Sequence, residues 1–261
     1  LARHDRDPAI VQRGLTILEH VTEMETLNGS DAQLRGRIDV NRIGLVGHSR
    51  GGESVVSAYL WSRRIQTLDV VVATHAHWDH IGGLQTVLRN FRIGEFWLGR
   101  GGENKNLDAL LQAASAGNVP IRQQAAGSRM NLDGATIDVF WPPPDWIPTK
   151  NGNNDSLVFR LGYGQRHVLL PGDAEASVER RLLRGVPLRS DIIKVSHHGS
   201  NDSTSPPFLE SVAPKFGIIS DAELNEQRQA DRRAAVVVRG KSRIASTTDR
   251  PAATRRRARG R

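Results

Sequence analysis

A cluster of metal-binding side chains is the most informative feature of the sequence. Residues 74–83 read THAHWDHIGG and place His75, His77, Asp79 and His80 within six positions. Imidazole nitrogens and carboxylate oxygens suit Zn²⁺, and they also suit Mn²⁺ or iron. Alternate residues of an extended chain point the same way, so His75 and His77 would share one side. A following turn would aim Asp79 and His80 at a neighbouring point. The pattern predicts a metal site, and the alternative is a polar loop that happens to contain histidines.

The residues around this cluster predict the elements that position it. The apolar run 68–73, LDVVVA, is typical of a buried strand, and residues 84–91 have the character of a helix. The cluster would then occupy a loop at the end of a strand. Loops of this kind carry the chemistry in α/β proteins.

Further segments extend the pattern along the chain. In chain order, the segments are AYLWSRRIQTLDVVVATHAHWDHIGGL (58–84), DVFWPPP (138–144), NNDSLVFRL (153–161), VLLPGDAEASVERRLL (168–183), SDIIKVSHHGSNDS (190–203) and APKFGIIS (213–220). Together with the motif H-x-H-x-D-H, they make the chain resemble the metallo-β-lactamase superfamily. The stretch from about Val55 to Ala222 resembles the C-terminal hydrolase domain of the DNA-uptake competence protein ComEC. The resemblance implies an αββα sandwich and metal-dependent hydrolysis.

The resemblance also implies the remaining metal ligands. Asp173 follows a short apolar strand, and in the superfamily this aspartate bridges two metal ions, which lie about 3.5–4 Å apart. An alternative is that Asp173 caps a helix over residues 174–183. Residues 191–195 are predicted to form a strand, and His197 and His198 follow it. One of these two histidines would be the last ligand, and the sequence leaves open which.

One histidine that is typical of the superfamily is missing. Between the first motif and Asp173, residues 153–156 read NNDS, as in the ComEC-like branch. Of the two ions that Asp173 would bridge, the one at the first motif would then be held by His75, His77 and Asp173. Water or Asp155 would complete this site. This composition predicts weaker or mononuclear metal binding. Many ComEC-like sequences carry aspartate at the position of His77, and the histidine here favours metal.

The N-terminal residues point to a different chemistry. Residues 42–46 are predicted to form a strand, and GHSRG at 47–51 has the form G-x-S-x-G. This segment resembles the nucleophile elbow of α/β-hydrolases, with Ser49 as the nucleophile. A serine hydrolase also needs a histidine and an acid later in the chain, but the later residues already match the other family. We therefore expect Ser49 to lack a triad.

Composition bounds these hypotheses. The chain of 261 residues could form one large or two small domains, and it contains no cysteine, which excludes disulfides and thiolate ligands. Residues 222–261 contain 12 Lys and Arg but 4 Asp and Glu, and this tail accounts for the whole net charge of +8. Such an arm could contact nucleic-acid phosphates, although a solvated disordered end is the favoured interpretation. No stretch approaches the roughly 18 apolar residues of a membrane span, and no secretory signal is visible.

The sequence thus predicts an α/β protein with three parts. These are an α/β-hydrolase-like fragment (1–57), a truncated metallo-β-lactamase-like αββα sandwich (58–222) and a disordered basic tail (223–261). The expected metal ligands are His75, His77, Asp79, His80, Asp173, His197 and His198.

The predicted activity is hydrolysis of phosphodiesters, with DNA as the candidate substrate and partner. One or two Zn²⁺ ions would activate water, with Mn²⁺ as an alternative metal. The expected catalytic residues are Asp79, Asp173 and His198, and Lys194 or His198 would contact a phosphate oxygen. Three alternatives stay open: a lactamase, lactonase or thioesterase using the same site, a serine esterase at Ser49, and a non-catalytic remnant that binds nucleic acid.

Overall fold

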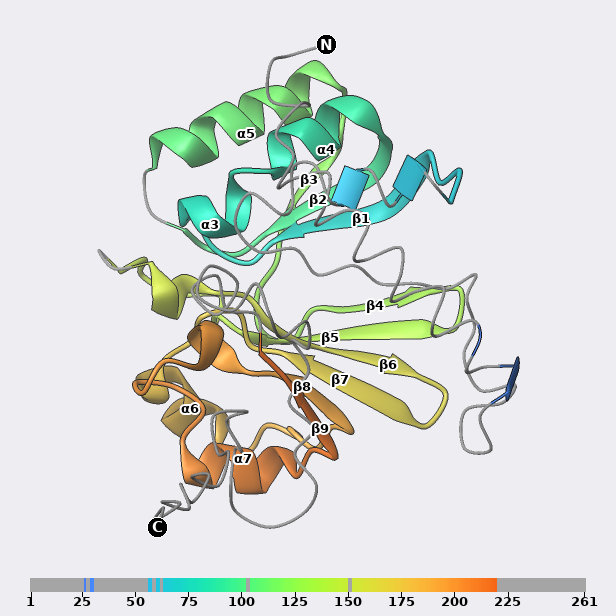
Figure 1. The fold of residues 1–261 in the computed structure, drawn as a ribbon. Coiled ribbons are helices and arrows are strands. Elements are labelled where there is room, and N and C mark those ends of the chain that lie inside the picture. The colour runs from blue at the N-terminus through green and yellow to red at the C-terminus, as the bar shows by residue number, and fades with distance from the viewer. Residues whose placement is uncertain are drawn as a thin grey trace, which may run out of the picture.

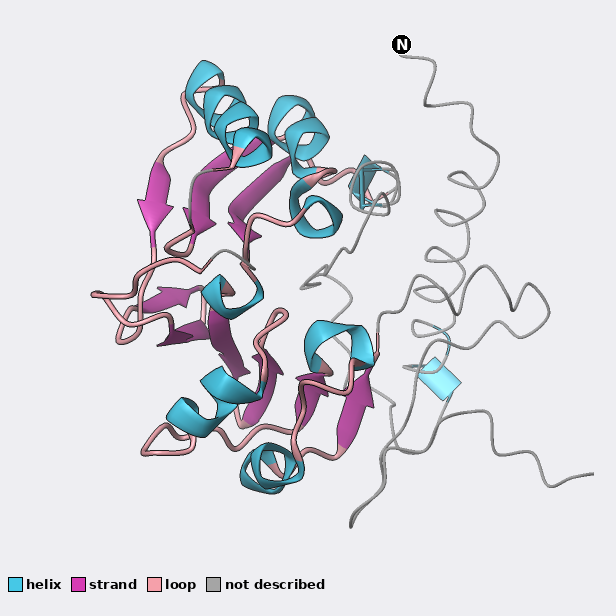
Figure 2. Ribbon diagram, turned by 90° about the vertical axis from the view of Figure 1, so that its left-hand side faces the viewer, coloured by secondary structure: helices cyan, strands magenta, loops and turns pink. Residues whose placement is uncertain are grey.

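Two stacked β-sheets with helices on both outer sides form the fold (Figure 1). The computed structural model describes residues 26, 29–30, 56–57, 60–61, 63–101, 104–149 and 152–219. Figure 2, turned by 90°, shows the same order of layers: helices, sheet, sheet, helices. This arrangement is the αββα sandwich that the resemblance predicted. The predicted strand at 42–46, Ser49 and the basic tail lie outside the described residues.

The first sheet is parallel, with the strand order β1-β2-β3. Its strands are β1 (Thr67–Ala73), β2 (Arg92–Leu98) and β3 (Ile121–Gln123), and its helices are α3 (Trp78–Ile81), α4 (Leu84–Asn90) and α5 (Lys105–Ala116). The helices lie in the crossovers that parallel strands require. The predicted strand at 68–73 and helix at 84–91 are confirmed as β1 and α4. None of the described helices is both long enough and apolar enough to cross a membrane.

In the described part of the chain the second sheet has six strands, and their order in the sheet follows the chain order. They are β4 (Arg129–Leu132), β5 (Ala135–Trp141), β6 (Val158–Tyr163), β7 (Arg166–Leu170), β8 (Ile192–Lys194) and β9 (Phe216–Ile218). Strands β4 to β7 are antiparallel, whereas β7, β8 and β9 are parallel. The helices α6 (Ala176–Leu182) and α7 (Pro206–Val212) make the two parallel crossovers.

Three apolar clusters hold the four layers together. The middle cluster joins the sheets, because Val70 and Val72 of β1 pack with residues of β5, β6 and β7. Val71 and Ala73 belong to the cluster under α4 and α5. A strand that is covered on both faces needs a continuous apolar run, which explains the sequence LDVVVA. The third cluster packs β7 and β8 against α6 and α7.

Asp191 anchors the start of β8 through three contacts. Its carboxylate accepts hydrogen bonds from Lys215 Nζ at 2.8 Å, from Arg166 at 3.0 Å and from the backbone N–H of His167 at 3.0 Å. The Lys215 ammonium has the largest effect and, with the other donors, lowers the pKa of Asp191 to about 2.

We expect Asp191→Asn to destabilise the fold in a pH-dependent way. Asparagine still accepts from the His167 N–H but loses both ion pairs, whose basic partners are largely exposed. The free energy of unfolding should fall by about 1 kcal/mol at pH 7, because solvent screens such pairs. Since the folded-state pKa is depressed, the difference is fully present above about pH 3.9. It should vanish as the pH falls through about 2.

Thermal melts across this pH range measure the difference. Asp145→Asn, at an exposed carboxylate, is the control and should change stability by less than about 0.5 kcal/mol. A gap between Asp191→Asn and the parent chain that stayed constant down to pH 2 would contradict the ion-pair explanation.

Candidate metal centre

Loops at the ends of β1, β7 and β8 bring the predicted metal-binding residues together. Asp79, His80, Asp173 and His198 each offer one ligand atom, and these atoms all lie within 4.8 Å of one another. Asp79 and His80 belong to α3, Asp173 follows β7, and His198 lies in the short helix η3 (Ser196–Gly199) after β8. The carboxyl end of a strand is the expected place for a site in an α/β fold.

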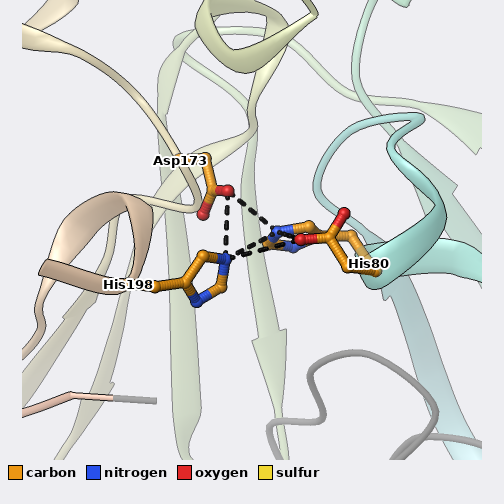
Figure 3. A group of neighbouring side chains, drawn as sticks. His80, Asp173 and His198 are labelled. Atoms are coloured by element: carbon orange, nitrogen blue, oxygen red, sulfur yellow. Dashed lines mark hydrogen bonds and ion pairs between the residues drawn. The ribbon is translucent and has the colours of Figure 1, made fainter. Parts of the chain in front are cut away.

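Asp173 faces both His80 and His198 in this cluster, and the two imidazoles also contact each other (Figure 3). Its Oδ2 atom is 2.9 Å from His80 Nε2 and 3.2 Å from His198 Nε2. Its Oδ1 atom is 3.4 Å from the Lys194 ammonium. Burial by itself raises the pKa of Asp173, but the hydrogen bonds with His198 and His80 and the nearby positive charge bring that pKa well below its usual range. The buried carboxylate is therefore charged at neutral pH.

The backbone before Asp173 is held in a conformation that favours glycine. Gly172 has a φ of +59°, and an added Cβ would lie 2.8 Å from the side chain of Ser156. This close approach lets the Asp173 N–H donate to Ser156 Oγ at 3.0 Å. Helix α6 begins at Ala176, and its N-cap is Glu175. The alternative that Asp173 caps this helix is therefore wrong.

His75 carries a buried ring nitrogen that needs a ligand. Its Nδ1 atom is 3.2 Å from Ser156 Oγ and 3.2 Å from Thr74 Oγ1. Its Nε2 atom has no hydrogen-bond partner in the described part of the chain and is 3.9 Å from Asp173 Oδ2. Burial, reinforced by repulsion from His80, lowers the pKa of His75 to about 2, so the imidazole is neutral. A buried nitrogen lone pair beside a charged carboxylate fits a divalent cation.

Besides His75, the predicted ligands His77 and His197 also lie outside the four-residue cluster. The ring of His77 packs edge-on against the ring of His75, with a centroid distance of 4.6 Å. His197 Nδ1 lies 3.0 Å from Asp202 Oδ1, and His197 forms a separate group with Asp202 and Glu175. His197 and His198 both have positive φ, 46° and 54°, which is uncommon for residues other than glycine. Of these two adjacent histidines, the structure brings His198 to Asp173.

Two polar residues of the predicted site have partners that the sequence did not predict. Lys194, one of two residues expected to contact a phosphate oxygen with His198 as the alternative, is buried, donates to Gly172 O at 3.2 Å and also contacts Asp173. A lysine within an apolar strand was the available signal. Asp155, the alternative ligand, accepts from Trp146 Nε1 at 2.8 Å and from the Thr149 N–H at 2.9 Å. These contacts hold its carboxylate in its own loop.

Comparison with known proteins identifies the family. The chain belongs to the metallo-β-lactamase superfamily, because the model of that superfamily matches residues 39–220, more than half of its length. Its relatives include competence proteins, in agreement with the resemblance to ComEC-like domains. The match begins upstream of Ser49, so it includes the segment that resembled an α/β-hydrolase elbow.

Three relatives illustrate this membership. ComE operon protein 3 of Bacillus subtilis (strain 168) is 31% identical over 176 residues, which cover 67% of this chain and 22% of that protein. Competence protein ComA of Neisseria gonorrhoeae is 28% identical over 163 residues, covering 62% and 21%. Hydroxyacylglutathione hydrolase GloC of Haemophilus influenzae (strain ATCC 51907 / DSM 11121 / KW20 / Rd) is 26% identical over 176 residues, covering 57% and 81%. The chain spans about a fifth of the length of the first two relatives.

The adjacent histidines His197 and His198 provide a matched test of the centre. We expect His198→Ala to weaken Zn²⁺ binding by more than about tenfold. Loss of a residue that only supports a metal ligand already lowers metal affinity by about tenfold, and His198 is itself a candidate ligand. His197→Ala should stay within about twofold of the parent chain, since its ring contacts Asp202 instead. Competition against a chromophoric chelator measures both affinities. Equal losses in the two variants would show that the cluster around Asp173 is not the binding site.

Proposed function

We propose that this chain is a metal-dependent phosphodiesterase that acts on DNA. The candidate ligands of its Zn²⁺ are Asp79, His80, Asp173 and His198, with His75 and His77 beside them. One observation carries the proposal: the buried, charged Asp173 has an oxygen that faces three imidazoles. One of these, His75, has a buried nitrogen without a partner among the described residues. The protein groups in the described part of the chain leave this nitrogen unsatisfied, and a cation would satisfy it.

A bound divalent cation supplies Lewis-acid chemistry, polarising the scissile phosphate and acidifying a water molecule. The residues of the chain divide the other tasks. Asp173 provides a fixed negative charge. The Lys194 ammonium contacts its carboxylate, and the hydrogen bond from the backbone N–H of Asp173 to Ser156 Oγ holds its backbone. Asp79 is the candidate to orient the attacking water, because its side chain is 42% exposed while that of Asp173 is 2% exposed. Its Oδ2 atom lies 3.6 Å from His80 Nε2 and 3.7 Å from His198 Nε2, next to the proposed cation.

The choice of DNA rests on relatives and charge. Similarity to the ComE operon protein and to a competence protein supports a role in DNA uptake. The 12 Lys and Arg of residues 222–261 would add phosphate contacts that strengthen at low salt.

A second candidate is thioester hydrolysis at the same site. It is favoured by the similarity to a hydroxyacylglutathione hydrolase, which the match covers over 81% of its length. The two candidates share the metal chemistry and differ in the electrophile, so substrates distinguish them.

We expect Asp173→Asn to lower hydrolysis of single-stranded DNA and of bis(p-nitrophenyl) phosphate by more than about 100-fold. The amide keeps the size of the side chain but loses the charge that would hold the cation. Asp138→Asn is the matched control, because Asp138 is also largely buried and paired with arginines but lies in β5. Turnover, bound metal and melting temperature are measured on all three proteins.

Other outcomes would overturn parts of the proposal. Cleavage of hydroxyacylglutathione but not of either phosphodiester would favour the thioesterase. Activity that survives a chelator, but is lost after fluorophosphonate labelling and in Ser49→Ala, would replace the metal enzyme by a serine esterase.

A further inference from the structure

A second buried polar atom without a partner points beyond the four-residue cluster. Among the described residues, His75 and Asn153 are each 5% exposed as whole residues, and His75 Nε2 and Asn153 Oδ1 both lack a hydrogen-bond partner. Leaving such an atom unsatisfied destabilises the folded protein. Buried polar atoms are nearly always satisfied in native proteins, so this pair calls for a common explanation.

Contacts on both sides of Asn153 place it against the two histidines of the first motif. Gly152, immediately before it, has a φ of +74°, and an added Cβ would lie 3.0 Å from His77 Nε2. Ser156, three residues after it, places its Oγ 3.2 Å from His75 Nδ1. The Leu157 N–H also donates to the carbonyl of Thr74 at 2.8 Å. The segment 152–157 therefore lies along residues 74–77.

Glu175 determines which way the Asn153 amide points. The amide nitrogen Nδ2 donates to Glu175 Oε1 at 2.9 Å. A carboxylate only accepts, so the nitrogen faces Glu175 and the carbonyl oxygen is turned away from it. The other carboxylate oxygen, Oε2, accepts separately from Asn154 Nδ2 at 2.8 Å, so the bond to Asn153 does not depend on Asn154.

We propose that Asn153 Oδ1 is a metal ligand and forms, with His75 and His77, a second cation position next to Asp173. This inference rests on the proposed function and extends it, because it assigns a ligand where the superfamily usually has a histidine. Glu175 is a positioning residue, since it holds the amide in the ligating orientation. Amide oxygens bind divalent cations, but they suit Zn²⁺ less well than imidazole does. The second ion therefore binds more weakly than the ion at His80 and His198.

Titration of the full chain with Co²⁺ tests the ligand directly. The parent chain should bind two ions in separate steps. Asn153→Leu, which keeps a similar volume without the oxygen, should lose the weaker step and keep the tighter one. His198→Ala should weaken the tighter step. Calorimetry gives the number of ions, and visible absorption reports the ligands, so no activity measurement is needed.

Asn154→Leu is the matched control. Asn154 also binds Glu175, but both of its amide atoms are satisfied, since its Oδ1 accepts from the Glu175 N–H at 3.1 Å. It should keep both steps. The double variant Asn153→Asp/Glu175→Gln retains a ligand oxygen at position 153, and the hydrogen bond between positions 153 and 175 then runs from the new amide to the new carboxylate. It should bind the second ion at least about tenfold more tightly than the parent chain, because the new ligand is charged. This variant keeps the test decisive if Asn153→Leu fails to fold.

The outcomes separate this inference from the proposed function. Two unchanged binding steps in Asn153→Leu, or no tightening in a folded double variant, would overturn the ligand role of Asn153. A single ion in the parent chain, lost in His198→Ala, would also overturn it while leaving the proposed function intact. A parent chain that binds no Co²⁺ would overturn both.

Discussion

The buried negative charge of Asp173 is the constraint on which the centre depends. Moving an isolated carboxylate out of water is so costly that it normally becomes protonated or acquires partners. Here the partners come from several directions: His80 from α3, His198 from η3 and Lys194 from β8. The backbone N–H of Asp173 also donates a hydrogen bond to Ser156 Oγ. Loops that are distant in the sequence are thus held around one charge, and an added cation would find its ligands already in place.

The strain needed for this arrangement is confined to the loops. Gly172 takes a left-handed conformation against Ser156, and His197 and His198 both adopt positive φ after β8. Each such non-glycine residue costs on the order of 1–3 kcal/mol. The surrounding layers can sustain that cost, because β1 is covered on both faces by apolar residues. The two-sheet core therefore acts as a rigid support for a polar edge.

A second carboxylate, Glu175, organises the opposite side of the centre. Its carboxylate accepts hydrogen bonds from the side-chain amides of Asn153 and Asn154, and Glu175 occupies the N-cap position of α6. Glu175 thus connects the start of α6 to the loop at 152–154, which contacts His77. Partners of this kind, one step removed from a metal, commonly set the orientation of the ligands. The proposed DNA hydrolysis would use the tightly held Asp173 together with the more exposed Asp79.

The sequence by itself determined the superfamily, the motif and the strands that carry it. Local patterns suffice there, because a strand covered on both faces must be an apolar run and a compact H-x-H-x-D-H cluster has few structural uses. It also predicted β8 and the end of β7, and hence the neighbourhood of Asp173 and His198. Only the tertiary structure separated His198 from His197, because adjacent residues differ in direction through backbone angles that depend on the surrounding packing. The same holds for Lys194, Ser156 and Asn153. Their partners lie far along the chain, and hydrogen-bond satisfaction can be assessed only once the layers have been assembled.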